Sequence, residues 1–238
     1  YNAIGTENVL KAAVESECKK FVYISTQAAA GPSKGNHCVT EKDEAMPVSL
    51  YGRSKREGEM IAFNYRHRLP VVIIRPVAVY GPRDPETLKI IKLIKSGIFP
   101  KPGLKKTKVC LIYVKDLVDL SINLITKDFV SGSVYFLSDG NEYHISDLLK
   151  TVGKIMGKGY ISFPVPRSAA LFFGVLNDSL SFFPFSPEFV SLDKIRELSE
   201  SWVCSIEKAK KELGYSPKFS LETGLTETIE WYKTNRWL

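Results

Sequence analysis

The chain has 238 residues, of which 44% are hydrophobic and 25% are charged, as in an ordinary globular protein of one large or two small domains. This composition does not fit a long disordered segment, and the apolar runs are too short to span a bilayer. The net charge of +7 comes from lysines spread over most segments, so it indicates solvated surface charge and no nucleic-acid partner.

The cysteines and histidines argue against a disulfide framework and against a metal site. The four cysteines are scattered with no C-x-x-C pair, which is typical of reduced thiols in the cytoplasm. Three histidines leave little from which to build a metal site, and none is predicted. The first residues have the pattern of a helix start, so no signal peptide is visible.

The first third of the chain alternates between helical and strand patterns. A helix with Thr6 as a candidate N-cap precedes a short apolar strand at residues 21–25. After a loop rich in Gly, Pro, Ser and Asn, a helix carries Tyr51 and Lys55, and a second buried strand at residues 70–75 ends at Pro76. This order predicts an α/β fold with a parallel sheet.

Later segments continue this pattern and then become mainly helical. We expect a helix at 85–96, a strand at 109–114, a helix capped by Asp116 and a strand at 133–137. We predict a nucleotide-binding domain over residues 1–140 and a smaller substrate domain over 141–238, with 84–108 a candidate part of the second. The expected later helices are 146–156, 167–176, 188–198, 205–213 and 220–235, with Ser205 and Ser220 as N-caps and Gly214 as a C-terminal glycine.

The topology predicts where a ligand binds. Ligands of parallel α/β sheets lie beyond the carboxyl ends of the strands. Ser25 and Thr26 end one strand, Pro76 to Val79 follow the other, and Tyr51 opens the helix between them. We therefore expect these residues to meet at one edge of the sheet.

Tyr51 and Lys55 have a spacing that suits proton transfer. Residues four apart on a helix lie on one face, so the ammonium can bias the phenol towards ionisation. The alternative is that Tyr51 is an ordinary half-buried helix residue and Thr26 a strand-end cap.

The chain contains no G-x-G-x-x-G turn of the kind that holds a dinucleotide pyrophosphate at a helix N-terminus. Either the protein binds no dinucleotide, or the chain is a fragment that lacks the first strands of its sheet. We favour the fragment, because the strands are few and the first helix has no visible sheet to pack against.

Several motifs, in order, resemble the extended short-chain dehydrogenase/reductase family, which includes nucleotide-sugar epimerases and 3β-hydroxysteroid dehydrogenases. The similarity covers nearly the whole chain, and the branch that it most resembles is the 3β-hydroxysteroid one. The matching segments are the N-x-x-G-T-x-N-x-L-x-A-A helix at 2–13, the hydroxyl-ended strand at 21–31, the Tyr-x-x-x-Lys at 51–55, the Arg-Pro turn at 75–82 and the late helix at 202–217.

The resemblance implies roles for individual residues. Tyr51 is the expected general acid/base, and Lys55 is expected to lower its pKa and to hold the nicotinamide ribose. Thr26, with Ser25 as second choice, is the expected catalytic hydroxyl, which stabilises charge on the reacting oxygen. Pro76 and Val79 are expected beside the nicotinamide ring of NAD or NADP. The fold implied is part of a doubly wound, Rossmann-type sheet lacking its first strands, with a smaller, mainly helical substrate domain.

The substrate side of the motif differs from that of nucleotide-sugar enzymes. Ala78 stands where those enzymes carry an Asn, and Lys108 or Val109 stands near their Arg, so a diphosphate finds few partners. The apolar segment 160–185 suits a hydrophobic substrate or contact with a membrane surface.

We therefore predict an NAD(P)-dependent oxidoreductase acting on a secondary alcohol or ketone, with a sterol-like substrate preferred. The alternatives are a nucleotide-sugar epimerase or dehydratase, and a non-catalytic binding or regulatory module. A homodimer through the helix that bears Tyr51 is left open.

Overall fold

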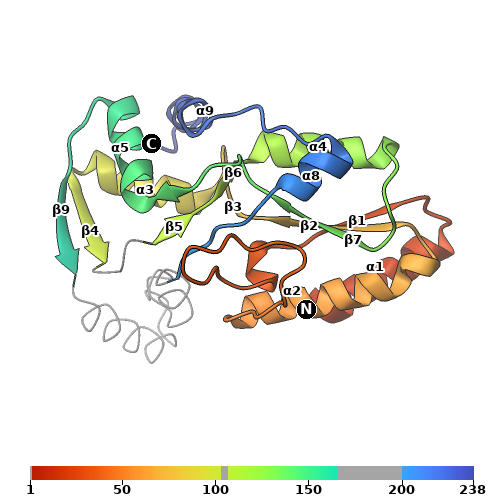
Figure 1. The fold of residues 1–238 in the computed structure, drawn as a ribbon. Coiled ribbons are helices and arrows are strands. Elements are labelled where there is room, and N and C mark those ends of the chain that lie inside the picture. The colour runs from red at the N-terminus through yellow and green to blue at the C-terminus, as the bar shows by residue number, and fades with distance from the viewer. Residues whose placement is uncertain (1, 103–106, 166–199) are drawn as a thin grey trace, which may run out of the picture.

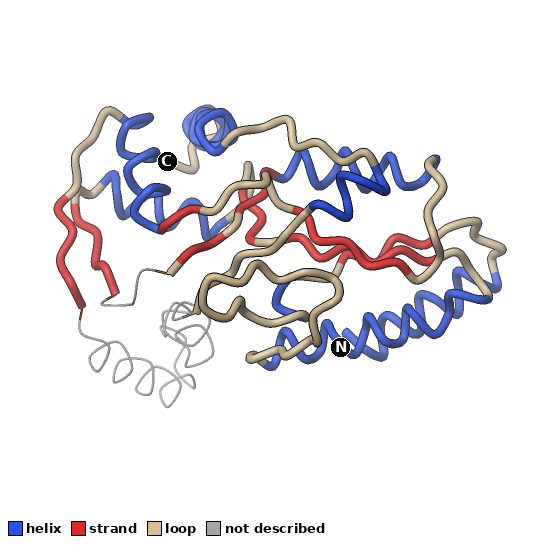
Figure 2. The backbone as a smooth tube through the Cα atoms, in the orientation of Figure 1, coloured by secondary structure: helices blue, strands red, loops and turns tan. Residues whose placement is uncertain are grey.

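The structure is a computed structural model that describes residues 2–102, 107–165 and 200–238. At its centre three strands lie side by side and parallel, in the order β1-β2-β7 (Figure 1; Figure 2). The predicted α/β architecture with a parallel sheet is confirmed. The three strands are β1 (Phe21–Ile24), β2 (Val71–Pro76) and β7 (Ser133–Leu137).

The central strand β2 is buried on both faces, which explains its continuous apolar run. Val71 and Ile73 pack into one core cluster, whereas Val72 and Ile74 pack into another, because successive side chains of a strand point to opposite faces. Helices cover both faces, as the doubly wound prediction requires (Figure 1). They are α1 (Asn2–Glu15) and α2 (Leu50–Asn64) on the first face, and α4 (Val114–Thr126) and α8 (Glu207–Leu213) on the second.

The start of α2 is fixed by a local cap. The side chain of Ser49 accepts a hydrogen bond from the backbone N–H of Gly52 at 3.1 Å, so one free donor of the first turn is satisfied. The short 3-10 helix η1 (Gln27–Ala29), which follows β1, has Thr26 as its N-cap. These two caps fix the residues at which η1 and α2 begin.

A second layer of elements packs beside the sheet around its own core. Ile91 and Ile94 of α3 pack there with Leu149 and Val152 of α5. The division of the chain near residue 140 stays a prediction, and α8 packs against β7 in the sheet core. The elements of this layer are α3 (Pro85–Lys95), α5 (Ile145–Met156), α9 (Leu221–Thr234), and the strand pairs β3 (Ala78–Tyr80) with β6 (Leu111–Tyr113), β4 (Ile98–Pro102) with β9 (Ile161–Val165), and β5 (Lys108–Val109) with β8 (Tyr143–His144).

The strand expected at 109–114 is instead two short strands, β5 and β6, separated at Cys110. The backbone N–H of Cys110 donates to the carbonyl of Trp202 at 2.8 Å, so the chain changes pairing partner here. Val114, the last residue of the expected strand, is the first residue of α4. The short strand β3, placed within a turn by its sequence, pairs in parallel with β6.

Asp116 does not cap α4, because the N-cap position is Tyr113 and Asp116 lies within the first turn. Its carboxylate is buried and accepts from the backbone N–H groups of Lys218 at 2.9 Å and Phe219 at 3.3 Å. Asp116 therefore ties α4 to the segment that leads into α9.

Of the three helix caps predicted in the last part of the chain, two are confirmed. Ser220 caps α9 and Gly214 ends α8 in the left-handed region. The N-cap of α8 is Ile206, although Ser205 still accepts from the N–H of Glu207 at 3.3 Å. The helices expected at 167–176 and 188–198, and most of the apolar segment 160–185, lie outside the described residues.

The first helix does pack against the sheet, contrary to expectation. Leu10 of α1 is fully buried in one cluster with Tyr23 of β1 and Ile73 of β2. Within the described residues, no helix combines the length and the apolar character needed to cross a membrane.

Gly52 is required by close packing between α2 and η1. A Cβ atom at this position would lie 2.4 Å from the carbonyl oxygen of Ala28. We predict that Gly52→Ala lowers the free energy of unfolding by about 1–3 kcal/mol in urea denaturation, because backbone must move to relieve the overlap. The control is Gly5→Ala in α1, where no atom lies within 4 Å. It is expected to raise stability by about 0.5–1 kcal/mol, and equal effects of the two variants would contradict the packing argument.

Candidate active site

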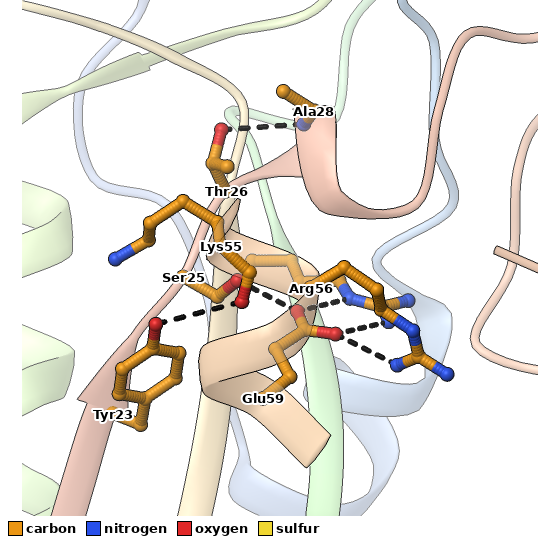
Figure 3. A network of polar contacts seen from close by, with 8 residues as sticks. Tyr23, Ser25, Thr26, Ala28, Lys55, Arg56 and Glu59 are labelled. Atoms are coloured by element: carbon orange, nitrogen blue, oxygen red, sulfur yellow. Dashed lines mark hydrogen bonds and ion pairs between the residues drawn. The ribbon is translucent and has the colours of Figure 1, made fainter. Parts of the chain in front are cut away.

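The first turns of α2 lie against the carboxyl end of β1. The ammonium of Lys55 donates to the carbonyl of Ile24 at 2.6 Å, and Gly52 packs closely on the carbonyl of Ala28. Figure 3 shows Lys55 close to Ser25 and Thr26, which directly follow β1. The helix start that carries Tyr51 is therefore held beside the strand end that carries the two hydroxyl residues.

The register of the sheet brings Pro76 to the same level as Thr26. Ile24 of β1 is paired with Ile74 of β2, and the N–H of Ser25 donates to the carbonyl of Ile74 at 2.7 Å. Thr26 keeps an extended backbone, so two further residues on each strand place Thr26 beside Pro76. The predicted convergence at one sheet edge thus follows from the parallel pairing.

A buried carboxylate joins the three elements of this edge (Figure 3). Glu59 of α2 is 1% exposed and accepts from Ser25 Oγ at 2.6 Å, from Arg56 Nη1 at 2.8 Å and from Arg75. The Arg75 guanidinium of β2 makes a two-point contact, Nε to Oε1 at 2.8 Å and Nη2 to Oε2 at 2.7 Å. Such bidentate, charge-assisted pairs are the strong hydrogen bonds of proteins.

These contacts keep Glu59 ionised. Burial alone raises the pKa of this carboxyl group, but the hydrogen bonds and the charge of Arg75, with the bonds from Ser25 and Arg56, reverse the shift. The pKa in the folded chain therefore lies below its ordinary value.

Tyr23 of β1 also lies next to Lys55 (Figure 3). Lys55 Nζ is 4.6 Å from the centre of the Tyr23 ring. A Cβ atom at Gly58 would lie only 2.2 Å from the Tyr23 hydroxyl oxygen. The glycine therefore allows the phenol to pack against α2. Burial lowers the pKa of Lys55, an effect that the Glu59 charge opposes.

The two candidate hydroxyl groups have different surroundings. Ser25 is buried, and its hydroxyl donates to Glu59. Thr26 is partly exposed, and its oxygen accepts from the N–H of Ala28 at 3.2 Å. That bond does not use the Thr26 hydroxyl hydrogen, which can donate to a reacting oxygen.

The other predicted site residues differ in exposure. Tyr51 is 53% exposed and Val79 is 37% exposed, whereas Pro76 is buried. Tyr51, Lys55 and Val79 are thus at least partly open to solvent, whereas neighbouring residues cover Pro76. The residues present fit the nicotinamide half of a dinucleotide, while the 238 residues contain no glycine-rich turn for its pyrophosphate.

Glu59 was not identified from the sequence. The sequence does contain a signal that such a carboxylate exists: Arg75 is a charged residue within an otherwise apolar strand that is buried on both faces. A buried guanidinium needs a carboxylate partner, and Glu59 lies one helical turn after Lys55 on the same face of α2.

The Glu59 contacts lead to a stability prediction. Glu59→Gln leaves the Arg75 guanidinium buried without a charged partner, so we expect the free energy of unfolding to fall by about 3–5 kcal/mol at neutral pH. The Glu59 contribution is complete above about pH 4.5, its ordinary pKa, and is lost as the pH falls through the lower folded pKa. The difference between wild type and variant should therefore narrow in acid.

Urea denaturation over a range of pH measures this difference. The matched control is Glu57→Gln, which removes an exposed carboxylate from the same helix and should change stability by less than about 0.5 kcal/mol. A difference for Glu59→Gln that does not depend on pH would argue against the charge explanation.

Comparisons with known proteins extend the resemblance. UDP-glucose 4-epimerase of Vibrio cholerae is 28% identical over 234 residues, covering 96% of this chain and 68% of that protein. Ceramide reductase of Caulobacter vibrioides is 30% identical over 224 residues, covering 92% of this chain and 64% of that protein. The crystal structure of dTDP-glucose 4,6-dehydratase from Bacillus anthracis in complex with NAD superposes with a TM-score of 0.77 at 24% identity, covering 99% of this chain and 68% of that one.

These proteins share the fold with this chain, which spans about two thirds of their length. A family model matches residues 1–137, a segment that includes β1, α2, β2 and all six predicted site residues. On this match, the chain belongs to the NAD dependent epimerase/dehydratase family.

Proposed function

We propose that the protein is an NAD(P)-dependent oxidoreductase that interconverts a secondary alcohol and a ketone and prefers a hydrophobic substrate. The observation that carries the proposal is the packing of the first turns of α2 on the end of β1. This packing holds the helix start that carries Tyr51 and Lys55 beside the strand end that carries Thr26. This set of groups suits proton transfer at a carbon-bound oxygen.

In the oxidation direction, Tyr51 as phenolate takes the proton from the substrate hydroxyl while the carbon gives up a hydride and the C=O bond forms. The acceptor for that hydride, and its donor in the reverse reaction, would be a bound nicotinamide. Thr26 donates a hydrogen bond to the reacting oxygen, and Lys55 stabilises the phenolate and holds the ribose. Ser25 is the weaker candidate for the hydroxyl role, because its hydroxyl already donates to Glu59. Pro76 and Val79 would pack beside the nicotinamide ring.

Two observations favour a hydrophobic substrate over a nucleotide sugar. Ala78 offers no hydrogen bond to a diphosphate, and the ammonium of Lys108 is paired with Glu142 at 2.8 Å. The similarity to a ceramide reductase also supports an apolar alcohol or ketone. The second candidate is a nucleotide-sugar epimerase or dehydratase, which the similarities to the Vibrio cholerae and Bacillus anthracis enzymes favour.

The proton-transfer role predicts a specific loss of activity. In the protein as its gene encodes it, Tyr51→Phe should lower kcat by about 10² or more, because the ring is kept and the proton carrier is removed. Tyr65→Phe, near the other end of α2, is the matched control and should keep wild-type kcat. Activity with 2-octanone is followed as NAD(P)H absorbance, and activity with UDP-glucose or dTDP-glucose is followed by chromatography of the sugar nucleotide.

The outcomes separate the two candidates. Tyr51-dependent oxidation of NAD(P)H by the ketone supports the alcohol dehydrogenase. Conversion of a sugar nucleotide without net change in the cofactor would replace it with the epimerase or dehydratase. Full activity of Tyr51→Phe would instead favour a member of the family that does not use this chemistry.

We also infer a homodimer formed through α1 and α2. Both helices expose large apolar side chains, among them Val9 at 57%, Met60 at 56% and Phe63 at 42%. Pairing the same face of two copies would bury these side chains in a self-complementary interface.

The four cysteines, which form no disulfide, support the cytoplasm as the location.

The dimer can be tested by charge. Met60→Lys places an ammonium in the inferred apolar interface, so we expect a monomer in sedimentation equilibrium where wild type is a dimer. Ile122→Lys on α4, a site 58% exposed, is the matched control and should remain a dimer. A monomeric wild type would refute the interface.

A further inference from the structure

Beside Val79 lies a small apolar cleft of about 160 Å³, formed by β3, β6, α3, α5 and α9. We propose that this cleft binds an apolar arm of about six carbons attached to the reacting carbon of the substrate. The inference rests on the alcohol or ketone chemistry proposed above and names the part of the substrate that gives specificity.

One wall of the cleft, β3, follows closely on the end of β2 that carries Pro76. β3 begins two residues after Pro76, which lies level with Thr26, and both Ala78 and Val79 are exposed. Val79, proposed to pack beside the nicotinamide, also lines the cleft. A substrate held between Tyr51 and the nicotinamide can therefore extend past Val79 into the cleft. Figure 1 shows α3 and α5 together at the far side of β3 from the three-stranded sheet.

The walls favour an apolar group. Eight of the twelve described lining residues are aliphatic: Ala78, Val79, Ile90, Ile91, Leu111, Leu148, Val152 and Leu225. Tyr80 adds an aromatic ring, and the hydroxyl of Thr87 already donates to Asp84. Dispersion contacts and the release of water are therefore the main forces available to a ligand here.

The charge at the rim disfavours a diphosphate. Asp84 and Glu86 contribute the only charged side chains among the described lining residues, and both are acidic. The Asp84 carboxylate accepts from the N–H groups of Glu86 and Thr87, each at 3.1 Å, as the cap of α3. Because that bonding holds Asp84 at the start of α3, a phosphate that enters must approach a fixed negative charge.

The volume sets the length of the arm. An engineered apolar cavity of about 150 Å³ holds a benzene molecule, which has nearly the size of a hexyl chain. A cleft of about 160 Å³ therefore accommodates one such group and no steroid nucleus. A longer arm must extend back into solvent.

The test uses the 2-alkanones from 2-butanone to 2-decanone with NADH or NADPH and the protein as its gene encodes it. We expect kcat/KM to rise roughly fourfold for each added methylene group, because each one is transferred from water to the cleft. The rise should stop near 2-octanone, whose longer arm is a hexyl group. No dependence on arm length would refute the proposal.

Two variants change the size of the cleft in opposite directions. Ala78→Leu fills its mouth, so the ratio of kcat/KM for 2-octanone to that for 2-butanone should fall by about tenfold or more. Ile90→Ala widens it, and the plateau should move to a longer ketone. Ala12→Leu, at an exposed alanine of α1, is the matched control and should keep the wild-type ratio. An unchanged ratio in both cleft variants would contradict the assignment.

A binding measurement does not depend on turnover. Benzene near saturation should raise the unfolding temperature of wild type and of Ala12→Leu, and should not raise that of Ala78→Leu. If uridine diphosphate gives this pattern and benzene does not, the cleft holds a nucleotide and the proposal is overturned.

If benzene binds as expected while the ketones show no Tyr51-dependent turnover, the cleft assignment holds and the proposed reaction fails. If turnover depends on Tyr51 but not on arm length, the reaction holds and the cleft assignment fails.

Discussion

The buried Glu59 carboxylate is the interaction on which the candidate site depends. A buried charge is costly unless it is paired, and Glu59 has two guanidinium groups and a hydroxyl as partners. These partners come from the end of β1, from α2 itself and from β2. Tyr51, Lys55 and Glu59 are four residues apart in turn, so they lie along one face of α2. Fixing Glu59 against the sheet therefore also fixes the direction in which Tyr51 and Lys55 face.

The parallel register supplies the second constraint. Because Ile24 pairs with Ile74, Ser25 stands beside Arg75 and Thr26 beside Pro76. Both residues of the inner pair, Ser25 and Arg75, bond to Glu59. The inner pair therefore holds the edge together, and the outer pair, Thr26 and Pro76, takes no part in the bonds to Glu59.

The sequence predicts the sheet well because its signals are local. The buried strands are continuous apolar runs, and the Tyr51 to Lys55 spacing is a property of one helix. The contacts that the sequence does not predict are those between residues far apart in the chain. Asp116 reads as a helix cap, yet its carboxylate bonds to the backbone of Lys218, about a hundred residues away. Cys110 interrupts an apparent strand because its backbone N–H bonds to the carbonyl of Trp202. Glu59 was missed for the same reason, since its partner Arg75 lies on another element.

The chain changes its structural role sharply after Pro76. Up to that residue, β2 is the centre of the parallel sheet, but β3 pairs with β6 and forms a wall of the apolar cleft. The reacting edge is built from residues 24–76, whereas the cleft is built from residues 78–152 and Leu225. None of the residues that bond to Glu59 lines the cleft, so the volume of the cleft can change without removing a bond of Glu59. On the proposed function, the residues for proton transfer and the residues that choose the substrate therefore belong to different parts of the chain, as expected when one fold serves several functions.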